Sequence, residues 1–132
     1  MDRNISILVV GNYQSTVPVV KDLLNQLGLS NIDKECDGAV ALKKLNETPY
    51  ELVISEWNIE SMSGMDFLKE VRATGNNVRF MMVAEQCGVQ DVLAAKEAGV
   101  DNFILKPLNA GTFRDKLQQM LGIQAFKTFR AM

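Results

Sequence analysis

Five short apolar runs alternate with five longer helical patterns along the chain, and this alternation constrains the fold more than any other feature. The apolar runs cover residues 5–10, 32–36, 52–55, 78–83 and 102–105. The first, third and fourth runs are almost continuously apolar, as expected of strands whose two faces are both covered. The second run alternates and is more polar, which is typical of an edge strand.

The helical patterns place apolar residues at spacings of three and four and cover residues 16–27, 38–47, 64–73, 89–98 and 110–121. Three of them end next to a glycine, namely Gly28, Gly99 and Gly122, as helices commonly do. The connecting loops are short, so consecutive strands must be parallel with right-handed helical crossovers. The sequence therefore predicts one doubly wound α/β domain with a five-stranded parallel sheet.

Composition excludes several classes of protein. A chain of 132 residues suits one core, and a net charge of −2 offers no basic excess for nucleic acid. No apolar run approaches the ~20 residues of a membrane span, and the amino terminus is too short and too acidic for a signal peptide. A cytoplasmic protein that binds neither nucleic acid nor membrane is expected.

Two residue types narrow the chemistry further. The chain has no histidine, which excludes histidine-based triads, phosphohistidine chemistry and most transition-metal sites. The two cysteines, Cys36 and Cys87, fall on strands too far apart in the predicted sheet to form a disulfide. We expect both to be reduced thiols.

In an open parallel sheet, ligands bind outside the carboxyl ends of the strands. The residues that follow the predicted inner strands are Gly11-Asn12, Glu56, Ala84-Glu85 and Lys106-Pro107. Most loop charges are simply solvated, but Glu56 and Lys106 both stand at the ends of buried strands. We therefore predict that Glu56 and Lys106 converge on one site and make contact.

These residues also carry a family resemblance. Its markers are Ile7-Leu8-Val9-Val10, Asp37-Gly38 with Ala41-Leu42, Leu52-Val53-Ile54-Ser55 with Trp57-Asn58, Ser63-Gly64, Ala98-Gly99-Val100 and Lys106-Pro107. In this order and spacing the chain resembles the receiver domain of bacterial response regulators, and most closely the single-domain, CheY-like chemotaxis receivers. The resemblance runs from about Ile5 to Gly122 and implies the strand order 2-1-3-4-5. We therefore predict a receiver domain over residues 1–122 and a C-terminal extension over 123–132.

The resemblance also implies a role for each site position. In that family an aspartate at the end of strand 3 accepts a phosphoryl group, an acid pair after strand 1 holds Mg²⁺, a hydroxyl residue follows strand 4, and a lysine precedes a cis proline. The equivalent positions here, together with the family's switch aromatic in strand 5, are Glu56, Gly11 and Asn12, Ala84, Lys106 and Pro107, and Phe103.

Most of that chemistry is missing from this chain. Gly11 has no side chain and Asn12 offers only a neutral amide oxygen, whereas Mg²⁺ prefers sites with carboxylates. Ala84 cannot donate a hydrogen bond to a phosphoryl oxygen. We therefore expect no metal or other cofactor, with Mg²⁺ binding lost or weak, and no enzymatic activity.

The resulting expectation is a degenerate receiver of a two-component system that acts as a phosphorylation-independent interaction module. Its partner would be a histidine kinase or a chemotaxis component, bound through the face of helix 4, strand 5 and helix 5. A rigid module is favoured over a mimic of phosphoaspartate, because Glu56 carries one charge where a phosphoryl group carries nearly two.

Three alternatives stay open from the sequence. Phosphorylation could use an unconventional acceptor such as Ser55, Ser61 or Ser63. A flavodoxin-like cofactor binder could use the polar loop of residues 11–16. Residues 123–132, with Ile123 and Phe126 at helical spacing, could form a docking helix, although a frayed extension is slightly favoured.

Overall fold

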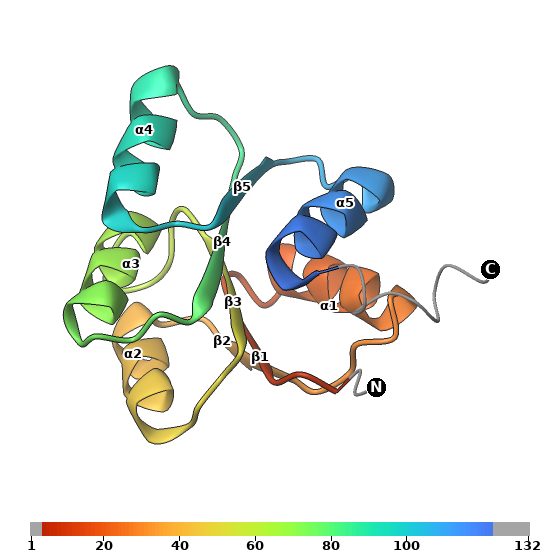
Figure 1. Ribbon diagram of the computed structural model, residues 1–132, viewed down its shortest axis with the longest axis horizontal. Helices are drawn as coiled ribbons and strands as arrows, with labels where there is room; N and C mark the ends of the chain where they lie inside the picture. Colours follow the sequence, from red (N-terminus) through yellow and green to blue (C-terminus); the bar gives the residue numbers. More distant parts are fainter. Residues whose placement is uncertain (1–3, 123–132) are drawn as a thin grey trace.

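The computed structural model of the protein describes residues 4–122 and consists of a parallel sheet with helices on both faces (Figure 1). The strands are β1 (Ile7–Val10), β2 (Ile32–Glu35), β3 (Leu52–Glu56), β4 (Arg79–Ala84) and β5 (Asn102–Leu105). The helices are α1 (Thr16–Gln26), α2 (Gly38–Glu47), α3 (Gly64–Ala73), α4 (Val89–Ala98) and α5 (Ala110–Leu121).

All strand pairs are parallel, and the strand order is β2-β1-β3-β4-β5. Helices α1 and α5 cover one face of the sheet, and α2, α3 and α4 cover the other (Figure 1). The predicted fold and strand order are confirmed. This arrangement brings the carboxyl ends of β1, β3, β4 and β5 to one edge of the sheet.

The sheet separates two apolar cores, which explains the continuous apolar runs. Ile7 and Val9 point into the core under α1 and α5, whereas Leu8 and Val10 point into the core under α2 and α3. All four side chains are buried. The edge strand β2 is half exposed, as its polar alternation predicts.

The main difference from the sequence prediction is α4. The helical pattern of residues 89–98 predicts a packed face that includes Leu93, but Leu93 is 56% exposed, and Ala95 is the one buried residue of the helix. The cause is the position of α4 at the β5 end of the sheet, where it packs beside α3 and has no helix on its other side (Figure 1).

The strand bounds differ by one or two residues. β1 begins at Ile7 instead of residue 5, because the N–H of Ser6 bonds the Glu51 side chain. β3 extends through Glu56, which pairs with Val83 of β4, so the carboxylate residue belongs to the strand itself.

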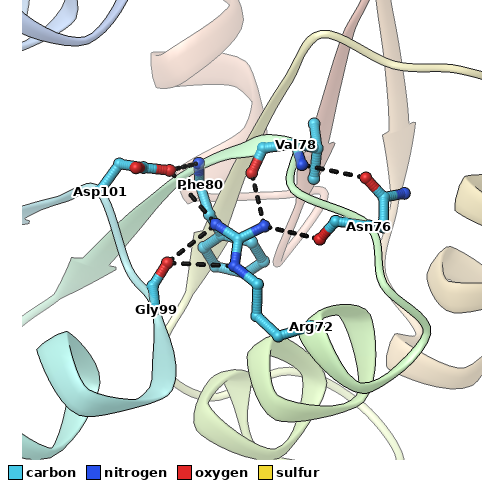
Figure 2. A network of polar contacts seen from close by, with 6 residues as sticks. All are labelled: Arg72, Asn76, Val78, Phe80, Gly99 and Asp101. Carbon is cyan, nitrogen blue, oxygen red and sulfur yellow. Dashed lines mark hydrogen bonds and ion pairs between the residues drawn. The ribbon is translucent and has the colours of Figure 1, made fainter.

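Arg72 links the connections that precede β4 and β5, at the amino edge of the sheet (Figure 2). This edge lies opposite to the predicted site. Its guanidinium donates to the carbonyls of Asn76 and Val78 before β4 and of Gly99 before β5, at 2.7–3.1 Å. It also contacts Asp101 at 3.2 Å. One side chain of α3 thus holds the starts of two strands and the end of α4.

Three smaller findings complete the fold. Cys36 and Cys87 are both free thiols, as predicted. No helix among residues 4–122 is long and apolar enough to cross a membrane. The predicted features of residues 123–132 lie outside the described residues.

Candidate functional site

Glu56 is the centre of the site at the carboxyl edge of the sheet. Its Oε1 accepts a hydrogen bond from the backbone N–H of Asn12 at 2.7 Å. Its Oε2 accepts bonds from the hydroxyl of Thr16 at 2.6 Å and from Nζ of Lys106 at 2.7 Å. The predicted contact between Glu56 and Lys106 is therefore present, and the carboxylate joins the ends of β3 and β5 to the β1–α1 loop and the first residue of α1.

Gly11 leaves the room into which this carboxylate extends. A Cβ atom at Gly11 would lie 2.7 Å from Oε1 of Glu56, which is closer than such atoms approach in proteins, and 3.0 Å from its Cγ, which is an unusually tight contact. The side chain of Glu56 thus turns toward the β1–α1 loop and fills the space beside Gly11. The longer acid and the glycine are sterically complementary.

The site is electrostatically balanced and only partly open to solvent. The side chain of Glu56 is 12% exposed and that of Lys106 is 24% exposed. Burial alone would raise the pKa of Glu56, but the hydrogen bonds from Lys106, Thr16 and Asn12 outweigh it and hold the pKa below its usual value. The carboxylate is therefore ionised at neutral pH.

The remaining predicted positions lie around this pair. Ala84 ends β4 and is buried, and it has no hydroxyl to offer. The bond between Lys106 and Pro107 is cis, as the resemblance implies. Phe103 is half-buried, and its ring lies 5.8 Å from the ring of Trp57, the residue after Glu56.

An open depression of about 560 Å³ lies over the site. Its lining is polar and includes Asn12, Glu56, Trp57, Ala84, Glu85 and Lys106. The sequence-predicted residues at the ends of β1, β3, β4 and β5 are thus brought together. Phe103 and Pro107 instead line the neighbouring depression beside β5.

The residues present do not suit a Mg²⁺ ion. Among residues 4–122, no three side chains of the His, Cys, Asp or Glu type gather as a possible metal site. Two carboxylates line the depression: Glu56 already accepts three hydrogen bonds, and Glu85 is exposed to solvent. The side-chain oxygen of Asn12 accepts the N–H of Gln14 at 2.8 Å, so it too is engaged.

The three alternative serine acceptors are also engaged. Ser55 is fully buried, and its hydroxyl donates to the carbonyl of Glu56 at 2.9 Å. Ser61 donates to Asp37 at 3.1 Å. Ser63 caps α3 by accepting the N–H of Asp66 at 3.0 Å. Phosphorylation of Ser55 or Ser61 would remove the hydroxyl proton that each of them donates.

The β1–α1 loop is equally unsuited to a phosphate-bearing cofactor. The N–H of Asn12 and the hydroxyl of Thr16 both donate to Glu56, so the donors that a phosphate needs are used by an internal anion. No described feature favours the flavodoxin-like alternative.

Thr16 is the site residue that sequence reasoning missed. It was noticed only as part of a polar loop, although it is 4% exposed and contacts Glu56 directly. A usable signal existed: a hydroxyl residue opens the helix that follows β1, and that helix begins at the same sheet edge as Glu56.

Comparison with known proteins places this geometry in a family. The family described as response regulator receiver domain matches residues 7–130, and the chain belongs to it. Chemotaxis protein CheY-3 of Vibrio cholerae serotype O1 is 31% identical over 122 residues, which cover 91% of this chain and 94% of the relative.

Solved structures agree on the fold. The crystal structure of Vibrio cholerae chemotaxis protein CheY4 superposes with a TM-score of 0.81 at 25% identity, covering 89% of this chain and 99% of that chain. The receiver domain of a sensor histidine kinase from Pseudomonas aeruginosa PAO1 gives a TM-score of 0.80 at 21% identity, covering 90% and 98%. The structure of that kinase receiver has a magnesium ion coordinated in its active site cleft.

Proposed function

We propose that this receiver is a phosphorylation-independent protein-interaction module in a two-component pathway, acting in the cytoplasm without a metal ion or enzymatic activity. The observation that carries the proposal is the engagement of the Glu56 carboxylate by Lys106, Thr16 and the backbone of Asn12. Glu56, at the phosphoacceptor position, thereby forms a structural ion pair with Lys106. The charge of Lys106, which would otherwise neutralise a phosphoryl group, is already balanced by Glu56.

Two further features support the loss of phosphoryl transfer. Transfer needs groups that stabilise charge building up on the phosphoryl oxygens, commonly a divalent cation and positioned donors. Here the acid-pair positions are Gly11 and Asn12, and the hydroxyl position is Ala84. Together with the glutamate at the phosphoacceptor position, three separate parts of the chemistry are altered or absent at one site.

A rigid module is a better description than a mimic of the phosphorylated state. The carboxylate of Glu56 turns toward Gly11 and the β1–α1 loop, and Ala84 offers no hydroxyl that could move inward toward it. The negative charge is held at the β1–α1 loop by the N–H of Asn12 and the hydroxyl of Thr16. Glu56 therefore holds one arrangement of the site and does not reproduce the charge of a phosphoryl group.

The surface best suited to a protein partner is a groove of about 660 Å³ formed by α4, β5 and α5. Its lining includes Val92, Phe103, Leu105 and Lys116. Leu105 in this groove is 48% exposed, and Leu93, which follows the groove residue Val92 on α4, is 56% exposed. Both β5 and α4 thus present apolar side chains that a partner would cover. Because the relatives are named chemotaxis proteins, a chemotaxis component or a histidine kinase is the partner class we propose.

The proposal is tested by incubating the protein with acetyl phosphate and millimolar Mg²⁺ and measuring its intact mass. We expect no gain of a phosphoryl group, whereas stoichiometric labelling would contradict the proposal. A conventional receiver treated in parallel shows that the donor is active.

A partner recovered from native lysate allows the second test. Glu56→Gln should bind that partner with an affinity within about twofold of wild type at a temperature where both are folded, because a rigid module does not signal through the charge. A large loss of affinity would instead identify Glu56 as a mimic of the phosphorylated residue.

A further inference from the structure

We propose that Gly11 is a positioning residue that makes the metal-free site possible, and that the Glu56 carboxylate, extended into the space beside Gly11, is an internal bridge across the sheet edge. The site would then hold its shape without a cation because an acid from β3 directly contacts the β1–α1 loop. The glycine at position 11 and the glutamate at position 56 would then depend on each other.

The requirement for glycine at position 11 is one of contact and not of backbone conformation. The glycines with positive φ in residues 4–122 are Gly28, Gly75, Gly99 and Gly122, and Gly11 is not among them. An alanine could therefore adopt the backbone of Gly11 without strain. Its Cβ would nevertheless lie 2.7 Å from a carboxylate oxygen, so either the carboxylate or the loop would have to move.

Movement of the carboxylate would have a cost because three donors hold it in place. Thr16 is buried, and the side chains of Glu56 and Lys106 are mostly shielded from solvent. Displacing Glu56 would leave the hydroxyl of Thr16, the N–H of Asn12 and the ammonium of Lys106 without their acceptor. The small side chain at position 11 thus controls contacts made by three other segments.

The bridge also explains why an aspartate would not serve equally well. Glu56 needs its full length to reach the N–H of Asn12, and the methylene that gives this length is the Cγ that lies 3.0 Å from the Cβ position at Gly11. Length at residue 56 and absence of a side chain at residue 11 are therefore matched to each other.

This inference concerns the site of the proposed function but does not depend on it. Gly11 and Glu56 could be coupled in a receiver that is still phosphorylated elsewhere, and a phosphorylation-independent module could exist without the coupling. Labelling by acetyl phosphate tests the function, and the following cycle tests the coupling alone.

The experiment is a double-mutant cycle of Gly11→Ala and Glu56→Ala, followed by thermal unfolding at neutral pH. In the presence of Glu56, Gly11→Ala should lower the melting temperature by about 5 °C or more. In the Glu56→Ala background the same change should lower it by less than about 2 °C, because the contact is gone. Equal losses in the two backgrounds, or no loss in either, would overturn the proposal.

A second measurement reports the position of the Glu56 carboxylate as well as the stability of the fold. The pKa of Glu56, followed by carboxyl ¹³C NMR, is expected below its usual value in wild type and shifted upward in Gly11→Ala, since the displaced carboxylate loses its donors. This readout needs only the single variant, so it holds even if Glu56→Ala folds poorly. An unchanged pKa of Glu56 in Gly11→Ala would overturn the proposal.

Discussion

At the scale of single residues, the charge of the Glu56 carboxylate is balanced by one neighbouring lysine. A cluster of acids repels itself, and two like charges ~4 Å apart cost about 4 kcal/mol at an effective dielectric of 20. Here one acid faces one lysine, with Nζ of Lys106 at 2.7 Å from Glu56. The repulsion that a cation would relieve is absent, so the site is balanced by its own residues.

The first prediction concerns the pH dependence of stability. The pKa of Glu56 is lower in the folded protein than its ordinary value of 4.5, so the ionised form stabilises the fold. Glu56→Gln should reduce the free energy of unfolding by about 2 kcal/mol at pH 7. This difference from wild type should persist down to pH 4.5 and then shrink as the pH falls through the folded pKa.

Urea unfolding at a series of pH values measures that difference, and Glu85→Gln is the matched control. Glu85 is an exposed carboxylate at the same sheet edge, so its neutralisation should change stability little. A wild-type advantage that has already disappeared near pH 6 would mean that burial dominates and raises the pKa of Glu56.

At the scale of elements, the two edges of the sheet are fastened differently. The carboxyl edge is joined by Glu56, whereas the amino edge is joined by Arg72, whose side chain is 18% exposed (Figure 2). The planar guanidinium reaches carbonyls on two separate connections at once, which an ammonium group cannot do with the same geometry. Helix α4 is therefore held at its carboxyl end, next to Gly99.

The second prediction follows from this fastening. Arg72→Lys should lower the free energy of unfolding by about 2 kcal/mol, because carbonyls of Asn76, Val78 and Gly99 lose charged donors. Arg79→Lys, an exposed change at the start of β4, should cost less than about 0.5 kcal/mol. Chemical denaturation of the two variants compares them, and equal stability would show that the network contributes nothing.

The third prediction concerns the exposed side of α4. Leu93→Glu should weaken binding to a recovered partner at least about tenfold if the docking face includes the exposed side of α4 next to the groove of α4, β5 and α5. Val40→Glu, a similar exposed change on α2, should leave binding unchanged. Both variants should melt close to wild type. Loss of binding in Val40→Glu alone would place the interface elsewhere.

The same elements show what sequence patterns could and could not predict. The buried strands and the helices α2, α3 and α5 were predictable because their apolar residues face two well-defined cores. The exposure of Leu93 was not predictable, because a helical pattern cannot tell whether a neighbouring helix covers it. The role of Gly11 was missed for a related reason: the absence of a side chain becomes informative only when its neighbour in space, Glu56, is known.

At the scale of the whole molecule, the fold places the loops that follow the five strands at one edge of the sheet. Two sets of contacts between these loops decide how rigid that edge is. Glu56 connects loops that follow β1 and β5, and the loop after β3 is tied to the one after β2. In that second link the N–H of Gly38 donates to the carbonyl of Glu60, and Ser61 donates to Asp37. The receiver architecture is thus held by internal contacts on both sides of Glu56.

The last prediction is that the stability of the whole domain does not depend on Mg²⁺. A ligand that binds only the folded state raises stability by RT ln(1 + [L]/Kd), so an ordinary metal site reveals itself in a melting curve. Millimolar Mg²⁺ should change the melting temperature of wild type by less than about 1 °C, because the Glu56 carboxylate is already engaged by three donors. The double variant Gly11→Asp with Glu56→Asp has two carboxylates at this edge and should acquire a Mg²⁺-dependent rise that chelation reverses. A clear rise in wild type would show that Glu56 leaves Lys106 to bind the cation, and would remove the basis for a metal-free site.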